Sequence, residues 1–176
     1  MEYQNLKHEF PPVWDSKSEI LILGSFPSVK SREQGFFYGH PRNRFWDVIS
    51  AVLQCSRPES IEEKRQMLLA GHIAVWDVIE SCRIQGSSDS SIRDVVANDL
   101  SEILSQAPIR MILANGRTAE KLYQKYIFPV THRPVTAMPS TSPANAAWSL
   151  ERLIDVYRSA IKKCRDKPTL SRGELS

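Results

Sequence analysis

The stretch Glu19-Ile-Leu-Ile-Leu-Gly24 decides the fold of this chain. It places four aliphatic residues in a row between a charged residue and a glycine. A strand that is apolar on both faces is typical of a buried parallel sheet. Further apolar runs follow at residues 73–79, 109–113 and 135–138. The sequence therefore predicts four buried strands.

Stretches with helical periodicity separate these strands. Apolar residues at helical spacing predict five helices. The first begins near Asn43, and the second runs from the capping box Ser60-Ile-Glu-Glu63 to Gly71. The third covers residues 92–104, the fourth follows Thr118, and the fifth covers residues 150–161. Parallel strands joined through helices need right-handed crossovers, which place helices on both faces of the sheet. We therefore expect a three-layer αβα domain with a central, mainly parallel four-stranded sheet.

The composition is that of one globular domain. A chain of 176 residues, 41% hydrophobic and 24% charged, is long enough for one core and too short for two full-sized domains. We expect a single domain over residues 1–165 and a basic, flexible tail over residues 166–176, where the periodic apolar residues end. No apolar run is long enough to cross a bilayer, and the first ten residues lack the apolar stretch of a secretory signal. These features favour a cytoplasmic protein with no membrane partner.

Three cysteines, Cys55, Cys82 and Cys164, are an odd number at wide spacing. This excludes a disulfide framework and a four-thiolate iron–sulfur cluster within one chain. The sequence implies no metal and no organic cofactor.

The charge is small overall but unevenly distributed. The net charge of +3 is too low to indicate a polyanionic partner by itself, although residues 158–176 alone carry +4. That terminal run is either a solvated tail or an added attraction for a polyanion. A second basic stretch, residues 24–46, holds four basic side chains against Glu33 and interleaves them with Phe26, Phe36, Phe37, Tyr38, Phe45 and Trp46. Basic residues among aromatic ones are typical of a nucleic-acid contact.

Four polar segments follow the four predicted strands, and open α/β sheets bind ligands at that edge. They are Gly24-Ser-Phe-Pro-Ser28, Asp77-Val-Ile-Glu-Ser-Cys82, Ala114-Asn-Gly-Arg-Thr118 and Pro139-Ser-Thr-Ser-Pro-Ala-Asn145. The first and last offer the small hydroxyls and helix starts that hold phosphate, although neither is a Walker loop. Any one of them alone is better explained as an ordinary strand-to-helix turn, and only their combination with the basic and aromatic stretch favours a binding site.

The segment Gly35-Phe-Phe-Tyr-Gly-His-Pro-Arg-Asn-Arg-Phe-Trp46 resembles the uracil-DNA glycosylase superfamily. Its parts Gly35-Phe36, His40-Pro41 and Asn43-Arg44-Phe45-Trp46 are similar to the mismatch-specific glycosylases, whereas the first and last polar segments are more similar to the hypoxanthine-DNA glycosylase branch. The motif order is similar from about residue 11 to residue 157. The resemblance implies a DNA repair glycosylase that flips a deaminated base, hypoxanthine foremost, out of DNA. It would hydrolyse the N-glycosidic bond and leave an abasic site.

One position departs from the superfamily pattern. The residue before the proline of the first motif is Asp or Asn in most members, where it positions the attacking water, but here it is Phe26. By resemblance to the hypoxanthine branch, the catalytic role passes to Asn43, whose amide oxygen can accept a proton of the water and orient its lone pair. The alternative role for Asn43 is that of a helix cap.

Base flipping requires a pocket and grips on the backbone. By resemblance, Phe36 is the stacking ring, with Phe37 and Tyr38 as alternatives, and Ser25 and Phe26 line the pocket beside it. The side chains expected to supply donors and acceptors to the hypoxanthine edge are Asp77, His40 and Asn115. The residues expected to contact DNA are Ser28, Lys30, Arg42, Ser140, Thr141, Ser142, Pro143 and Asn145, the last two in a loop that enters the vacated stack.

Three alternatives remain open. Uracil, or thymine or uracil mismatched with guanine, is an alternative substrate. Phe26 also allows a catalytically silent DNA-binding module of the same fold. A serine hydrolase built on Ser25 or Ser140 with His40 and Asp77 is disfavoured, because no Gly-x-Ser-x-Gly elbow is present. For the favoured reading we expect a monomer that acts on DNA containing a deaminated base.

Overall fold

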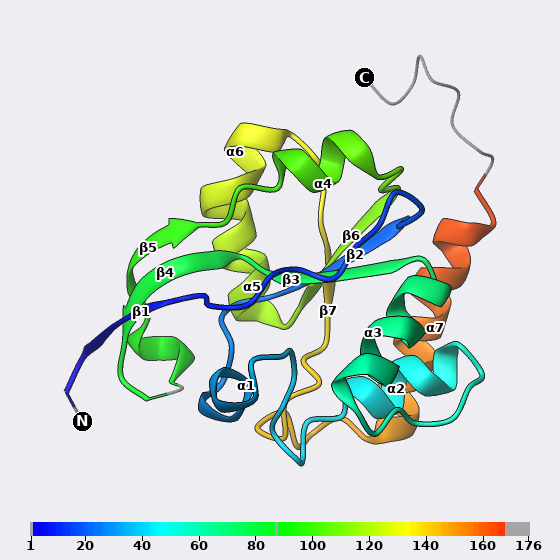
Figure 1. Cartoon of the computed structure of the whole chain (residues 1–176), viewed down its shortest axis with the longest axis horizontal. Helices are drawn as coiled ribbons and strands as arrows, with labels where there is room; N and C mark the ends of the chain where they lie inside the picture. Colours follow the sequence, from blue (N-terminus) through cyan, green and yellow to red (C-terminus); the bar gives the residue numbers. More distant parts are fainter. Residues whose placement is uncertain (1, 87, 168–176) are drawn as a thin grey trace.

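A four-stranded parallel sheet lies at the centre of this computed structural model, which describes residues 2–86 and 88–167. The strand order is β3-β2-β6-β7 (Figure 1). The strands are β2 (Ile20–Gly24), β3 (Ile73–Asp77), β6 (Met111–Asn115) and β7 (Thr136–Met138). Every residue of β2 is buried, and each of its four aliphatic side chains contributes about 1.5–3 kcal/mol by that burial. The predicted strand at the centre of the sheet is confirmed.

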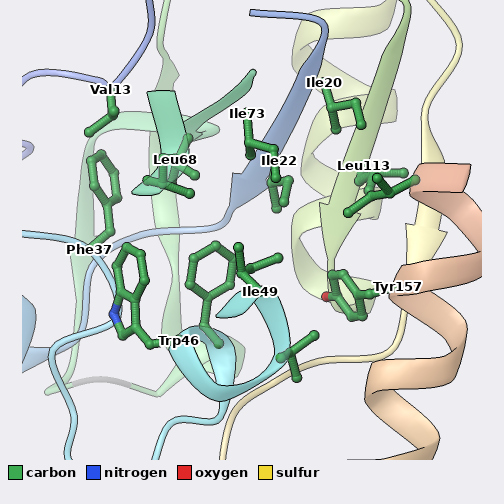
Figure 2. Packing of buried hydrophobic residues seen from close by; sticks show 14 of the residues in the cluster. Val13, Ile20, Ile22, Phe37, Trp46, Ile49, Leu68, Ile73, Leu113 and Tyr157 are labelled. Atoms are coloured by element: carbon green, nitrogen blue, oxygen red, sulfur yellow. The ribbon is translucent and has the colours of Figure 1, made fainter. Parts of the chain in front are cut away.

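Helices cover both faces of this sheet, as predicted. Ile20 and Ile22 of β2 join one hydrophobic cluster with residues of α2 (Phe45–Val52), α3 (Ile61–Ala70) and α7 (Leu150–Arg165). Figure 2 shows Ile22 and Ile73 from the sheet on the same side as Ile49 and Trp46 of α2.

The alternate residues of β2 face the opposite layer. Leu21 and Leu23 pack with residues of α4 (Ser101–Gln106) and of the π-helical turn η2 (Tyr123–Ile127). That turn connects α5 (Arg117–Leu122) to α6 (Phe128–Thr131). The two clusters are therefore separated by a single sheet, as a three-layer domain requires.

A second, antiparallel sheet was not predicted. It consists of β1 (Gln4–Lys7), β4 (Ile79–Ile84) and β5 (Arg93–Ala97) in the order β1-β4-β5. The single strand predicted over residues 73–79 is thus two strands, with Val78 between them. The short helix α1 (Val29–Gln34), which follows β2, is not among the helices that the sequence predicts.

The helix predicted over residues 92–104 is wrong in its first half. Its apolar residues recur at helical spacing, but residues 93–97 form β5 and only residues 101–106 form α4. Val95 and Val96 are β-branched, and β4 offers them an antiparallel partner with pairs such as Ser81–Val96. Tertiary pairing therefore overrides the helical pattern.

The helix ends follow the sequence signals in part. Ser60 accepts a hydrogen bond from Glu63 N, as a capping box predicts, whereas the Glu63 carboxylate accepts one from Glu59 N, one residue before the cap. α5 begins after Gly116, with φ of +98°, so that Thr118 lies inside the helix and does not cap it. Nearly all of the tail expected over residues 166–176 lies outside the described residues. None of the described helices has the length and hydropathy needed to cross a membrane.

Candidate active site

A cavity of about 290 Å³ opens where β2, β3 and β6 end. Because these strands are parallel, the polar segments that follow them meet at one edge of the sheet. Most of the predicted site residues line this cavity: Ser25, Phe26, Ser28, Lys30, Tyr38, His40, Asn43, Asp77, Asn115, Ser140, Thr141, Ser142 and Pro143. Asn145 lines an adjoining cavity of about 400 Å³ instead.

The floor of the cavity holds a buried carboxylate. Asp77, at the end of β3, lies 2.8 Å from His8 through its Oδ2 and the His8 Nε2, and both side chains are almost fully buried. The Asp77 backbone carbonyl accepts a hydrogen bond from Asn98 Nδ2. Its Oδ1 lies against Gly24, where an added Cβ would stand only 2.5 Å from that oxygen. The carboxylate is therefore fixed in position, with Oδ1 left without a partner among the described residues.

His8 is a site residue that sequence reasoning missed. It follows β1 and reaches Asp77 from 69 residues away in the chain. The rings of Phe10 and Phe37 pack beside it, with centroids 4.4 and 5.9 Å from the imidazole. The only local signal is the alternation of Leu6, His8 and Phe10, which is too short to identify a buried edge strand.

Tyr38 brings a hydroxyl to the same floor. Its backbone is left-handed, with φ of +52°, and its ring stacks on Phe45 with centroids 4.0 Å apart. The hydroxyl is buried without a hydrogen-bond partner of normal geometry, although the Asn115 side chain is near enough to lower its pKa slightly. Burial, and secondarily the negative charge of Asp77, raises the pKa of Tyr38 well above its usual value. The phenol therefore stays protonated and can donate.

Asn43 belongs to a three-residue network on the cavity wall. Its Oδ1 accepts hydrogen bonds from Phe45 N at 2.9 Å and from Thr141 Oγ1 at 2.8 Å. Thr141 in turn exchanges two hydrogen bonds of 3.0 Å with the Asn115 side chain. Both lone pairs of the Asn43 oxygen are thus engaged, whereas its amide nitrogen has no partner among the described residues. This differs from the expectation that the oxygen is free to accept a proton from water.

The loop over residues 139–149 is held by Arg44. The guanidinium donates to the backbone carbonyls of Ser142, Asn145 and Trp148, the first two at 3.0 Å. The Arg44 backbone N–H also donates to the carbonyl of Thr141. The sequence groups Arg44 with the basic residues of a nucleic-acid contact, but the structure turns it inward. Arg44 fixes the backbone of the loop and does not bind the serine side chains of that loop.

The serine hydroxyls expected to grip phosphate have local roles as acceptors. Ser28 Oγ accepts from Ser31 N and caps α1. Ser140 Oγ and Ser142 Oγ accept from the backbone N–H groups of Ser142 and Ala144. The protons of Ser140 and Ser142 have no acceptor among the described residues and are free to donate to a ligand.

The two predicted basic contacts lie at the surface. Lys30 forms an exposed ion pair of 3.4 Å with Glu33. Arg42 is exposed, does not line the cavity, and donates its backbone N–H to His40 Nδ1.

The placement of Phe36 as the stacking ring is corrected by the structure. Phe36 packs against Phe37 and Trp46 in the core and does not line the cavity. Phe26 and Phe37 line the cavity in its place. Consecutive aromatic residues point in different directions, and only the packing of the core decides which of them reaches the site.

The serine hydrolase arrangement is not assembled. The buried carboxylate of Asp77 pairs with His8, and His40 accepts a hydrogen bond from its neighbour Arg42. Ser25 donates to Asp89 at 3.4 Å. The three groups that a triad would join therefore have other partners.

Asp89 is the second site residue that sequence reasoning missed. It lies in the short turn η1 (Asp89–Ser91) between β4 and β5, in a stretch that the sequence marks only as a serine-rich loop. It lines both the main cavity and the adjoining one. Burial of its carboxylate raises the pKa of Asp89, and hydrogen bonds from Thr118 and Ser25 partly offset this effect. Asp77 and Asp89 are the two acidic residues of the cavity lining in the described part of the chain.

Comparisons with known proteins agree with this geometry. Residues 11–164 match the model of the Uracil DNA glycosylase superfamily. A hypoxanthine DNA glycosylase from Methanosarcina acetivorans is 36% identical over 149 residues, which are 84% of this chain and 93% of that protein. One from Methanosarcina barkeri is 34% identical over 113 residues, 63% of this chain and 72% of that protein. The solution NMR structure of a candidate uracil DNA glycosylase from Methanosarcina acetivorans superposes with a TM-score of 0.75 at 32% identity, covering 89% of this chain and 96% of that one.

The fold and its cavity define a base-excising enzyme of the α/β class, and the chain belongs to the uracil DNA glycosylase superfamily. DNA glycosylases are hydrolases that act on N-glycosyl bonds, and their substrate is DNA. The family resemblance of the motifs is thereby confirmed, as is the α/β fold.

Proposed function

We propose that this protein is a monofunctional DNA glycosylase that releases hypoxanthine from DNA and leaves an abasic site. The observation that carries the proposal is the pair of unpartnered groups on the cavity floor, the Asp77 Oδ1 acceptor and the Tyr38 hydroxyl donor. The edge of hypoxanthine presents an N1–H donor next to an O6 acceptor, which such a pair complements. Both Methanosarcina relatives are named for the same base.

In this proposal the flipped base lies on the floor and the backbone lies on the rim. Phe26 or Phe37 provides the stacking surface, and His40 and Asn115 complete the wall. Ser28, Ser140 and Ser142 hold the flanking phosphates, while Lys30 and Arg42 add attraction for the backbone. Thr141 orients Asn43 and Asn115, and Pro143 and Asn145 enter the space that the base leaves.

Asn43 positions the hydrolytic water in this mechanism. Its free amide nitrogen donates to the water oxygen, while its carbonyl oxygen keeps the amide fixed through Phe45 and Thr141. The bond to the sugar breaks as positive charge develops on the sugar, so positioning and electrostatics contribute most of the catalysis. The proton that the water loses then needs an acceptor other than the Asn43 oxygen.

Uracil is the second candidate substrate. It presents the same donor and acceptor pair at N3–H and O4, and the superposed NMR structure is that of a candidate uracil DNA glycosylase. Because hypoxanthine and uracil share the recognised edge, these contacts do not separate the two substrates, and a measurement of activity on each does.

The test is incubation with duplexes that carry inosine, uracil, xanthine or a guanine–thymine mismatch, followed by alkaline cleavage. We expect cleavage of the inosine strand first, and an Asn43→Ala protein that is nearly inactive. Asn43→Asp keeps the oxygen that accepts from Phe45 N and serves as the matched variant for folding. Binding of inosine duplex without cleavage by the wild type would favour the silent DNA-binding module and contradict the proposal.

We further propose that residues 1–165 act as one domain, as a monomer in the cytoplasm. Two observations support this. All three cysteines are free, as in a reducing compartment. The exposed large apolar side chains of the described residues are scattered over several elements: Val29, Ile61, Val96, Phe128 and Val130. Light scattering should give a mass near 20.0 kDa, and cell fractionation tests the location.

A further inference from the structure

A carboxylate at the mouth of the cavity has no role in the function described so far. Asp89 belongs to the hairpin of the second sheet, but it reaches Ser25, the residue directly before Phe26 in the loop after β2. It lies at the boundary that the main cavity shares with the adjoining one, together with Ser140 and Ser142. A negative charge is thus held at the rim on which the DNA backbone is proposed to lie.

This charge is unfavourable for DNA binding. Among the described residues Asp89 forms no ion pair, and its hydrogen bond from Ser25 is long at 3.4 Å. A carboxylate near phosphates repels them. A carboxylate that lines a cleft and has a raised pKa, as Asp89 does, is a candidate for a catalytic residue.

We propose that Asp89 is a catalytic residue that accepts the proton of the hydrolytic water and stabilises the positive sugar by its charge. It would supply from the β4–β5 connection what the Phe26 side chain cannot supply from the loop after β2. The inference rests on the proposed function and adds a residue to it.

The chemistry balances with water as the co-reactant. The bond between C1′ and the base nitrogen breaks, and its electron pair leaves with the base, which takes a proton from solvent. The water oxygen bonds to C1′, and the proton that it loses moves to the Asp89 carboxylate, which later returns it to solvent. The sum is a base, an abasic sugar and no other product.

The other acceptors of the cavity are engaged elsewhere. Asp77 is fixed on His8 through Oδ2 and its Oδ1 is assigned to the edge of the base, while the Asn43 oxygen already accepts two hydrogen bonds. The long hydrogen bond between Ser25 and Asp89 is the contact that a water molecule replaces at least cost. Asn43 and Asp89 therefore divide the work, since one holds the oxygen of the water and the other takes its proton.

The test is Asp89→Asn, which keeps the shape of the side chain and removes its charge. Single-turnover release of hypoxanthine should slow about 100-fold or more, the range for loss of a general base. Binding of duplex to the variant should be unchanged or tighter, because a charge that repels phosphate is gone. Asp94→Asn is the matched control, since Asp94 lies on β5 of the same hairpin, is 68% exposed and pairs with Arg83. It should retain the wild-type rate.

Rescue by a small acid separates catalysis from structure. Asp89→Ala should regain part of its rate when formate is added, because formate can occupy the vacated position, and Asp94→Ala should not respond. An active wild type with an unimpaired Asp89→Asn protein would overturn this inference and leave the proposed function standing. A loss of rate matched by loss of binding and by a lower melting temperature would also overturn it. A wild type that releases no base would overturn the proposed function and this inference together.

Discussion

Tyr38 holds a buried hydroxyl that the folded protein does not satisfy. An unpaired buried donor costs about 1–3 kcal/mol, and removing the whole group recovers that cost. Such a group persists where a ligand supplies the partner, which in the proposed function is the O6 of the flipped base. The left-handed backbone at Tyr38 is consistent with a residue placed for function, because strained positions cluster at such sites.

Tyr38→Phe should therefore leave the free energy of unfolding unchanged or raise it by about 1–3 kcal/mol. Release of hypoxanthine should fall about tenfold, the effect of one neutral hydrogen bond. Denaturant titration and single-turnover kinetics measure the two effects. Tyr157→Phe is the control, because the Tyr157 hydroxyl donates to the Pro139 carbonyl and its loss should only destabilise the protein. A Tyr38→Phe protein that is less stable but fully active would contradict this assignment.

Asp89 gives a prediction for pH and stability. Burial raises the pKa of Asp89 above its ordinary 3.8, so the folded protein binds more protons than the unfolded chain as the pH rises past that value. The wild type therefore loses stability through this window and stays destabilised at neutral pH. Asp89→Asn should be more stable than the wild type at pH 7, and the difference should shrink as the pH falls toward 3.8. Denaturant titration at both ends checks the sign.

At the scale of elements, the close approach of β2 and β3 sets the floor of the site. Gly24 pairs with Asp77 in the parallel register, and the absence of a side chain at Gly24 leaves room for Oδ1. No side chain larger than hydrogen fits there without moving the carboxylate away from His8. The glycine is thus required by the carboxylate beside it and not by the backbone conformation.

Gly24→Ala should fold with a loss of about 1–3 kcal/mol and lose nearly all activity, because its methyl group displaces Asp77. Gly35→Ala is the matched control. It has φ of +69° and open space around it, so it should lose about 1 kcal/mol of stability and keep its activity. Thermal melts and inosine cleavage compare the two variants. Equal activity of both would show that the position of Asp77 is unimportant.

The elements that the sequence predicts best are those with local signals. The aliphatic runs give β2, β6 and β7, and the capping box gives the start of α3. β1 has no such signal, and its pairing with β4 joins residues about 80 positions apart. The local signal in β5 is misleading, because its apolar residues recur at helical spacing while its valines also favour a strand.

The candidate site shows the same division. The polar segments after the strands predict where the cavity opens and most of the residues around it. Contacts between distant segments, such as His8 with Asp77 and Ser25 with Asp89, depend on the second sheet and leave no local pattern. The inward turn of Arg44 is likewise decided by the loop that it meets.

At the scale of the whole molecule, the two basic segments that the sequence singles out lie in different places. Arg165 donates to the carbonyl of Gly71, just before β3, so the end of α7 lies at the opposite edge of the sheet from the cavity (Figure 1). Lys30 and Arg42 lie on the cavity side, in the segments around α1 and before α2. The end of α7 is therefore too distant to contact DNA that is held at the cavity.

This separation predicts the salt dependence of DNA binding. Lys30→Ala and Arg42→Ala should each weaken binding and reduce the slope of log K against log salt concentration by about 0.9, the value for one phosphate contact. Lys163→Ala, on α7, should leave both quantities nearly unchanged. Fluorescence anisotropy with an inosine duplex over a salt series measures the slopes. Equal effects of all three would indicate that the duplex extends over the opposite edge.

The hydrogen bonds from Arg44 to three backbone carbonyls have a consequence for the recognition of a damaged base. The loop over residues 139–149 has a fixed conformation before it contacts the double helix, so little conformational entropy is lost on binding. A change in the conformation of this loop therefore does not distinguish one base from another. Intact and damaged stretches are then held alike during scanning. Discrimination must come afterwards, from how readily each nucleotide leaves its stack and from whether the buried floor completes its hydrogen bonds.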